Sequence, residues 1–234
     1  MYLSKEQLEE LTHFDTPTVW NALEGFKLRP AIIGFSWPGL TLMTSRTKPL
    51  VGYAVTAKVS GLTAPAAAEK AMMFDFYANV RAMDAPSIAV VEDVDEIPIG
   101  SFWGEVQATT FKALGAEGTI THGGVRDLTE VNDLDFQFFA TCIMVARAES
   151  HVIDTNCTVR ISGMTVHPGD LIHADLHGAV VIPEEAAPAL AEACRRVSNA
   201  ERCVLEPCRE AIRTGTKPTI DQLRQWRGEM AKRR

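Results

Sequence analysis

The fold is decided by residues 86–139, which read PSIAVVEDVDEIPIGSFWGEVQATTFKALGAEGTITHGGVRDLTEVNDLDFQFF. Short apolar runs alternate in this stretch with segments whose apolar residues recur at helical spacing. The alternation predicts strands at 87–91, 118–121 and 136–139, separated by helices at about 103–114 and 128–134. Strands that are joined through helices run parallel, with right-handed crossovers. The stretch therefore predicts a β-α-β-α-β unit at the centre of an α/β fold.

Outward from this unit, the flanking segments add short strands and terminal helices. On the N-terminal side we expect two short helices within the first 25 residues, a loop at 25–49, a strand at 51–60 and a helix at 64–83. A capping box at Ser4 and a cap at Asp15, followed by Pro17, mark the two helix starts. On the C-terminal side we expect strands at 157–161, 164–166, 171–174 and 179–182, then helices at 184–206 and 220–232. This predicts one domain over residues 1–234, with a core at about 15–183 and a helical extension at 184–234.

Composition narrows the class of protein. A net charge of −7 and a pI near 5.4 argue against a nucleic-acid partner, because binding to phosphates depends on clustered Lys and Arg. No uncharged apolar run approaches the ~20 residues that span a bilayer, so we expect no membrane segment. The N-terminus lacks a secretion signal, and five cysteines without a CxxC pair are typical of a reducing compartment. These features predict a cytoplasmic protein.

Two turns follow successive predicted strands and carry the candidate chemistry. They span 101–107 and 122–127, and parallel neighbours would place them at one edge of the sheet, across one crevice. Gly104 opens a helix and offers unpaired backbone amides to an anion. Arg126 supplies a planar fork for a carboxylate, and Asp127 and Glu105 supply hard oxygen ligands for a hydrated Mg²⁺.

Each of these residues also has a structural interpretation. Asp127 followed by Glu130 is a capping box for the second helix, and Gly123-Gly124 is compatible with a simple tight turn. Glu105 is a favourable first-turn acid, and Arg126 could be a surface cation. The combination of these residues, rather than any one of them, favours a site.

Several glycine-centred motifs resemble those of a known family. They are Gly104-Glu105, Gly115, Gly118, Gly123-Gly124-Val125-Arg126-Asp127, Gly169-Asp170-Leu171 and the run from Asp175 to Pro183. Together they resemble the RraA-like superfamily, which includes 4-hydroxy-4-methyl-2-oxoglutarate and 4-carboxy-4-hydroxy-2-oxoadipate aldolases and the regulator of ribonuclease E activity. The resemblance covers about residues 15–200 and implies a swivelling β/β/α fold. It also implies a homotrimer or a dimer of trimers, with the active site between subunits.

The resemblance further implies roles for individual residues. Arg126 would bind the pyruvyl group of a small 2-oxo acid, and Asp127 would hold a hydrated Mg²⁺ or Mn²⁺. Glu105 would meet the metal through water. The substrate carboxylate would bind backbone amides in the turn formed by Gly104, Glu105, Val106 and Gln107.

The activity implied is a metal-dependent retro-aldol cleavage of a 4-hydroxy-2-oxo acid to pyruvate, with oxaloacetate decarboxylation as a side activity. A Schiff-base aldolase is the rival enzyme, with Lys58, Lys70 or Lys112 as the nucleophile. A non-catalytic regulator that binds a partner protein is the alternative from a different class. A methyltransferase is disfavoured, because no glycine-rich cofactor loop precedes an acidic strand end.

Two further residues leave alternatives open. His122 stands where the family usually has Asp, and its imidazole could bind metal, act as a base or cap a strand end. Glu201 interrupts an apolar stripe formed by Leu190, Cys194, Val197 and Val204. It would act either in an interface ion pair or, as in the aldolases, as a catalytic glutamate in the site of a neighbouring subunit.

Overall fold

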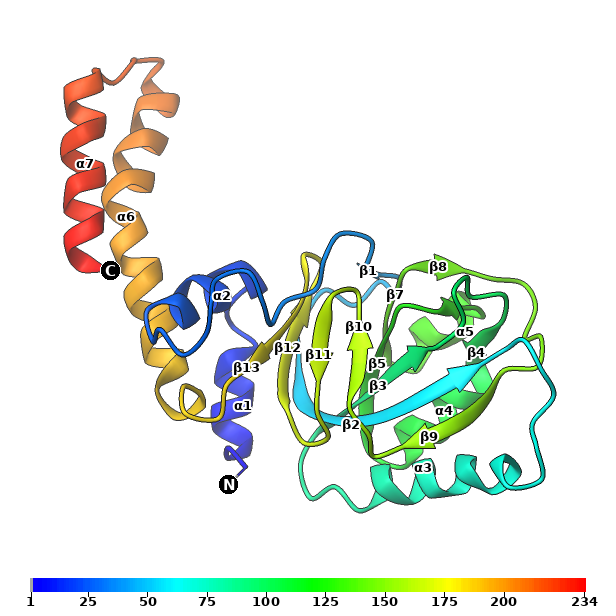
Figure 1. Ribbon diagram of the computed structural model, residues 1–234. Helices are drawn as coiled ribbons and strands as arrows, with labels where there is room; N and C mark the ends of the chain where they lie inside the picture. Colours follow the sequence, from blue (N-terminus) through cyan, green and yellow to red (C-terminus); the bar gives the residue numbers. More distant parts are fainter. Residues whose placement is uncertain (1) are drawn as a thin grey trace.

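The computed structural model describes residues 2–234 and contains the predicted central unit (Figure 1). Its strands and helices are β3 (Ser87–Asp93), α4 (Glu105–Ala113), β5 (Ala116–Thr121), α5 (Leu128–Asp133) and β7 (Gln137–Ala140). The strands β3, β5 and β7 are parallel neighbours, in that order. The β-α-β-α-β prediction is therefore confirmed.

The central unit forms half of a larger mixed sheet. Next to β3 lies the long strand β2 (Leu50–Ser60), which runs parallel to it. Antiparallel strands complete the sheet: β1 (Thr41–Leu42) beside β7, β9 (His151–Thr155) and β12 (Leu171–Asp175) beside β2, and β13 (Gly178–Ile182) beside β12. The sequence predicted β2, β12 and β13 but neither β1 nor β9, whose short segments become strands only by pairing with distant partners.

A second, small sheet lies beside the C-terminal ends of the central strands. It consists of β4 (Ser101–Trp103), β6 (Gly124–Val125) and β8 (Cys142–Ile143), all parallel. Each of its strands follows one strand of the main sheet along the chain: β4 follows β3, β6 follows β5, and β8 follows β7. The strands are too short for a periodic signal, so the sequence predicted turns at β4 and β6 and no element at β8.

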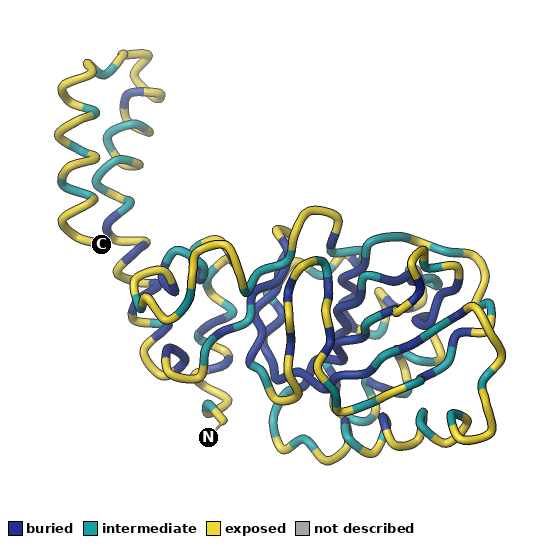
Figure 2. The backbone as a smooth tube through the Cα atoms, viewed as in Figure 1, coloured by how far each residue is buried: buried dark blue, intermediate teal, exposed yellow. Residues whose placement is uncertain are grey.

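Apolar residues fill both faces of the main sheet. One face is covered by α3 (Met72–Arg81), α4 and α5, and its core is rich in aromatic rings, with Trp103 packed against Phe111 and Phe138. The other face is covered by a hairpin of β10 (Val159–Ile161) and β11 (Met164–Val166). Figure 2 shows the sheet strands as the most deeply buried part of the chain. The fold thus rests on a two-sided sheet core.

The terminal helices pack around the edge of the sheet formed by β12 and β13. Both predicted caps are present: Ser4 forms a capping box on α1 (Lys5–Leu11), and Asp15 accepts from the Thr18 amide at the start of α2 (Thr16–Glu24). The first half of α6 (Leu190–Thr214) packs on α2 through buried side chains that include Cys194 and Val197. Within residues 2–234, no helix is both long and apolar enough to cross a membrane.

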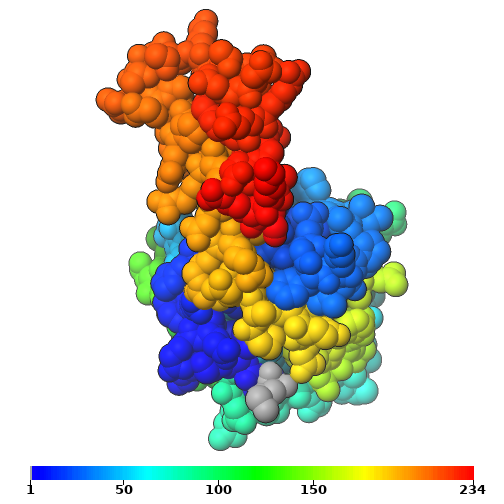
Figure 3. All heavy atoms as spheres, turned by 90° about the vertical axis from the view of Figure 1, so that its left-hand side faces the viewer, coloured from blue at the N-terminus to red at the C-terminus, as the bar shows by residue number. Residues whose placement is uncertain are grey.

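The last part of the chain forms a helical hairpin that stands away from the body. Its arms are α6 and α7 (Ile220–Arg233), and α7 begins with a capping box at Thr219. Figures 1 and 3 show the hairpin, drawn in orange and red, rising clear of the sheet, and most of its surface is exposed. The prediction ended the first arm at about residue 206, but α6 runs on through Pro207 to Thr214, where packing against α7 supports it.

One helix prediction was too long. The segment 64–83 was expected to be helical throughout, whereas a 3-10 turn at Glu69–Ala71 precedes α3, which begins only at Met72. Pro65 disfavours helical geometry for Ala64 before it, and residues 64–68 form no helix.

Phe111 and Phe74 provide a matched test of the core assignment. Phe111 is fully buried against Trp103 and Phe76, whereas Phe74 is 72% exposed. We expect Phe111→Ala to lower the free energy of unfolding by about 3–5 kcal/mol, because it leaves a cavity in the core. Phe74→Ala should change it by less than about 0.5 kcal/mol. Urea denaturation measures both, and equal losses would contradict this core.

Candidate functional site

The two predicted turns lie in direct contact, rather than across a crevice. In the small sheet, Ser101 pairs with Gly124 and Trp103 with Val125. The Arg126 amide continues this ladder by donating to the Trp103 carbonyl at 3.0 Å. The pairing places the start of α4 beside the residues that lead into α5. The expected neighbourhood is therefore present, and strand pairing creates it.

Asp127 occupies an unusual position in this arrangement. It precedes α5, but its backbone is left-handed (φ 58°, ψ 41°) and its side chain makes no capping hydrogen bond to that helix. Its Oδ2 instead accepts from the Glu105 amide at 3.0 Å, and so caps the neighbouring helix α4. The interpretation of Asp127 and Glu130 as a capping box for α5 is therefore wrong. A left-handed non-glycine residue costs about 1–3 kcal/mol, and such residues cluster at functional sites.

Gly104 allows this contact because it has no side chain. A Cβ atom at Gly104 would lie 2.5 Å from Asp127 Oδ2 and 3.2 Å from Arg126 Cγ. Its own backbone is extended, at φ −159°, which any residue can adopt. The glycine is therefore required by close packing against Asp127, and not by backbone conformation.

Arg126 and Asp127 present their charges together at the surface. The Arg126 Nε lies 3.6 Å from Asp127 Oδ2, and both side chains are a little more than one third exposed. The Arg126 Nη1 also donates to the Val145 carbonyl, at 3.4 Å. Because this ion pair is exposed, it adds little to stability. It leaves Asp127 Oδ1 and much of the guanidinium available to a ligand.

The start of α4 offers backbone donors rather than side chains. The Glu105 amide is occupied by Asp127, but the amides of Val106 and Gln107 have no acceptor among residues 2–234. The Gln107 side chain accepts from the Tyr77 hydroxyl at 2.7 Å and is directed toward α3. The Glu105 side chain is exposed. A bound carboxylate would therefore be held by amides, with Glu105 at its margin.

His122 ties two strand ends together. Its Nε2 lies 2.7 Å from the Asp93 carbonyl oxygen, and since a carbonyl can only accept, Nε2 carries the proton. Its Nδ1 is buried and has no hydrogen-bond partner within residues 2–234. In this arrangement the imidazole has no nitrogen that faces solvent. The geometry therefore favours a structural role, in which His122 links two strand ends, over a role as a metal ligand or a base.

Asp93 was not predicted as a site residue. It ends β3 and is almost fully buried, and a Cβ atom at Gly123 would lie 3.0 Å from its Oδ2. Burial raises the pKa of the Asp93 carboxyl, and the nearby charge of Asp95 adds to that effect, while the backbone hydrogen bond from Asp95 opposes it. An acid at the end of a buried strand, where ligands bind in such sheets, was the available signal.

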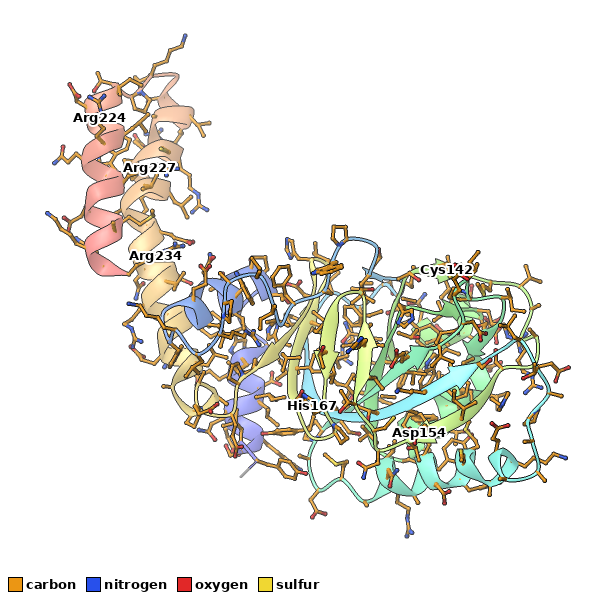
Figure 4. The ribbon with its side chains drawn as sticks, viewed as in Figure 1. Cys142, Asp154, His167, Arg224, Arg227 and Arg234 are labelled. Carbon is orange, nitrogen blue, oxygen red and sulfur yellow. The ribbon has the colours of Figure 1, made fainter. Side chains whose placement is uncertain are left out.

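Glu201 lies far from these residues in the same chain. Its Oε1 accepts from Arg234 Nη2 at 2.8 Å, across the α6–α7 hairpin. Figure 4 places Arg234 on the hairpin and Cys142 of β8 at the opposite end of the molecule. The structure therefore unites Gly104, Glu105, Arg126 and Asp127, and it leaves Glu201 out of the group that a single chain can form.

Comparison with known proteins identifies the family. The family model described as RraA-like, Aldolase/RraA, matches residues 16–181. The chain belongs to this family, as the motifs around Arg126 indicated. The α6–α7 hairpin lies outside the matched segment.

Three known proteins show how far the similarity extends along the chain. The chain is 30% identical over 141 residues to protein DlpA of Legionella pneumophila, covering 59% of this chain but only 22% of that protein. It is 28% identical to a Halalkalibacterium halodurans protein named "Putative 4-hydroxy-4-methyl-2-oxoglutarate aldolase", covering 62% and 68% of the two chains. The crystal structure of Streptomyces coelicolor RraAS2 superposes with a TM-score of 0.69 at 20% identity, covering 86% and 96%. That likeness establishes the fold.

Gly104→Ala tests the contact between the two turns. We expect it to break the Asp127–Glu105 hydrogen bond, because the added Cβ and Asp127 Oδ2 cannot share the space. The free energy of unfolding should fall by about 0.5–2 kcal/mol, the usual cost of a lost helix cap. The Glu105 amide should also exchange faster with solvent deuterium. Gly228→Ala in α7 is the control, since its Cβ meets nothing within 4 Å. An unchanged Glu105 exchange rate would contradict the contact.

Proposed function

We propose that this protein is a divalent-metal-dependent lyase that cleaves a 4-hydroxy-2-oxo acid to pyruvate by a retro-aldol reaction. One observation carries the proposal: β4–β6 pairing gathers the Arg126 guanidinium, the Asp127 carboxylate and the free amides of α4 in one exposed turn pair. The aldolase-like family and the name of the Halalkalibacterium halodurans relative agree with it.

The residues present fit a hydrated cation rather than a caged one. Among residues 2–234, no three His, Cys, Asp or Glu side chains converge closely enough to hold a metal ion. Mg²⁺ commonly binds through one or two carboxylates and keeps several waters, and Mn²⁺ also accepts such hard ligands. Asp127 would hold the ion, with Glu105 reaching it through water. When bound, the metal would supply Lewis-acid polarisation of the substrate's keto group.

The chain's own groups account for binding and charge stabilisation. The amides of Val106 and Gln107, at the positive end of the α4 dipole, would hold the substrate carboxylate. Arg126 would donate to the keto oxygen, where negative charge develops as the C3–C4 bond breaks. A preorganised donor that meets charge as it develops lowers the barrier. Decarboxylation of oxaloacetate develops charge on the same oxygen, so it is expected as a side activity.

None of the rival Schiff-base lysines belongs to the turn pair, which spans 101–107 and 122–127. Lys112 lies at the far end of α4 from Glu105 and pairs with Glu117 at 2.7 Å. Lys58 lies 3.9 Å from Glu92 on the main sheet. Lys70 is in the exposed 3-10 turn before α3. The location of these amines supports the metal-dependent alternative.

The base that removes the C4 hydroxyl proton is proposed to come from a second copy of the chain. The exposed turn pair is bordered by apolar side chains that a monomer leaves in water, above all Val145, 94% exposed, with Val106 and Ile143.

Residues 190–234 carry eleven Lys or Arg and six Asp or Glu, a net charge of +5, whereas residues 1–189 carry a net charge of −12. A basic hairpin and an acidic body are electrostatically complementary between copies. We propose a homotrimer, or a dimer of trimers, in which Glu201 enters a neighbour's site.

The activity is tested with 4-hydroxy-4-methyl-2-oxoglutarate and with oxaloacetate, by following pyruvate release with and without EDTA. We expect Arg126→Ala to lower kcat by about 10²–10³-fold, the usual cost of one preorganised donor. Asp127→Asn should keep the left-handed turn and the bond to Glu105 but abolish metal-dependent activity. Arg81→Ala, an exposed arginine at the end of α3, is the control.

Turnover that persists in EDTA would contradict the metal requirement. No turnover of either acid, together with partner binding that Arg126→Ala leaves intact, would indicate the alternative, a non-catalytic regulator that binds another protein. That function would use the same fold without requiring the Arg126 guanidinium.

Subunit mixing tests whether Glu201 acts across an interface. Arg126→Ala and Glu201→Gln are each expected to lose nearly all activity alone. If the two residues meet only between copies, co-refolding equal amounts should restore about a quarter of the sites, because random neighbours then supply one intact residue each. Light scattering on the same samples reports the oligomeric state. No recovery in a mixed oligomer would place Glu201 outside the site.

A further inference from the structure

A cavity lies outside the Arg126 turn pair, and none of the residues 101–107 or 122–127 lines it. It has a volume of about 220 Å³ and is formed by the start of α2, the segment at 35–36 and the turn between β12 and β13. Its apolar walls include Pro17, Trp20 and Phe35, and the two aromatic rings meet edge to face with centroids 4.8 Å apart. Ser36 and His177 supply polar groups to the same cavity. The proposed lyase activity uses none of these residues.

A buried carboxylate fixes the orientation of His177. Asp175 is 3% exposed, and its Oδ1 lies 3.1 Å from His177 Nδ1 and accepts from the His177 amide at 2.8 Å. Its Oδ2 accepts from the Thr16 amide at 2.9 Å. Burial raises the pKa of Asp175, but the hydrogen bonds from Thr16 and His177 outweigh burial and hold that pKa below its ordinary value. Asp175 is therefore ionised at neutral pH, and His177 donates to it through Nδ1–H.

A second histidine, His173, holds Thr16 in place through the Thr16 hydroxyl. His173 is fully buried, and its Nε2 lies 3.2 Å from the Leu11 carbonyl, so Nε2 carries the proton. Its Nδ1 consequently accepts from the Thr16 hydroxyl at 2.9 Å. Burial lowers the pKa of His173, which keeps the ring neutral. Thr16 is thus held on both its hydroxyl and its amide, and the imidazole of His177 is fixed through Asp175.

The remaining polar groups define what a ligand must offer. The Nδ1 of His177 is bonded to Asp175, and the side chain is 48% exposed. Its Nε2 can therefore accept a hydrogen bond from a ligand. Ser36 Oγ accepts from the Ala179 amide at 2.9 Å, which leaves its hydroxyl hydrogen free to donate. A ligand hydroxyl satisfies both groups at once, since it donates to His177 and accepts from Ser36.

The local charges argue against an anionic ligand. Asp175 carries a buried negative charge, and Asp15 caps the start of α2 next to Thr16. These two carboxylates already occupy the amides of Thr16 and Thr18, so the helix start has little left to offer an anion. A neutral ligand with an apolar body fits the walls formed by Trp20 and Phe35.

We propose that this cavity is a binding site for a small neutral phenol or a similar hydroxylated apolar molecule. The ring would pack against Trp20, Phe35 and Pro17, and the hydroxyl would bridge His177 Nε2 and Ser36 Oγ. The site is independent of the Arg126 turn pair, so its occupancy does not depend on the lyase proposal.

The test uses 4-methylphenol as the probe on the full-length protein, followed by ligand-detected NMR and calorimetry. We expect His177→Asn to weaken binding by about 10-fold, the value of one lost hydrogen bond. His167→Asn is the matched control, because His167 lies on the β11–β12 turn and contacts Thr158 instead (Figure 4). Trp20→Leu should weaken 4-methylphenol and toluene alike, whereas His177→Asn should affect only the phenol.

Three results would overturn the proposal. They are no saturable binding of 4-methylphenol, equal binding by the wild type and His177→Asn, or tighter binding of 4-methylbenzoate than of the phenol. Circular dichroism and urea unfolding of each variant establish that it is folded. Arg126→Ala should bind the probe like the wild type, which separates this site from the proposed lyase site.

Discussion

The hydrogen bond from the Glu105 amide to the Asp127 carboxylate joins the two turns on which the proposed site depends. It can form only because β4 and β6 pair in parallel, because Asp127 adopts a left-handed backbone, and because Gly104 leaves room for a carboxylate oxygen. The strained backbone of Asp127 is held by this contact and by the Arg126 amide bonded to Trp103. One short contact therefore fixes the relative positions of a guanidinium, a carboxylate and a helix start.

The same geometry leaves the turn pair open to solvent, bordered by exposed apolar side chains such as Val145 and Ile143. Apolar side chains that cluster at the surface often mark contacts with other molecules. The hairpin of α6 and α7 projects from the body of the protein. Its net charge is positive, whereas the net charge of the body is negative. An assembly of several copies would satisfy both features, and it would account for a carboxylate such as Glu201 on a helix remote from its own chain's site.

Much of the fold follows from local sequence. The central strands and helices, the caps at Ser4 and Asp15 and the motif around Arg126 were predicted, because periodicity, capping chemistry and glycine spacing are encoded within a few residues. The prediction failed where the local structure depends on contacts with distant segments of the chain. Strands β1, β4 and β9 have no periodic signal of their own, and α6 crosses Pro207 because α7 packs against it. Asp93 was overlooked, because its burial behind Gly123 depends on how β3 and β5 are paired.

The sequence by itself determined the parallel unit, the family and the residues that gather in the turn pair. Only the tertiary structure decided which atoms these residues use. Asp127 caps α4 instead of its own helix. His122 donates a hydrogen bond to the Asp93 carbonyl, and the Gln107 side chain accepts one from Tyr77. It also decided that Thr16 holds the Asp175 carboxylate that orients His177, across 159 positions of the chain. The reason is that hydrogen-bond partners are chosen by proximity in space, which strand pairing sets and local sequence does not encode.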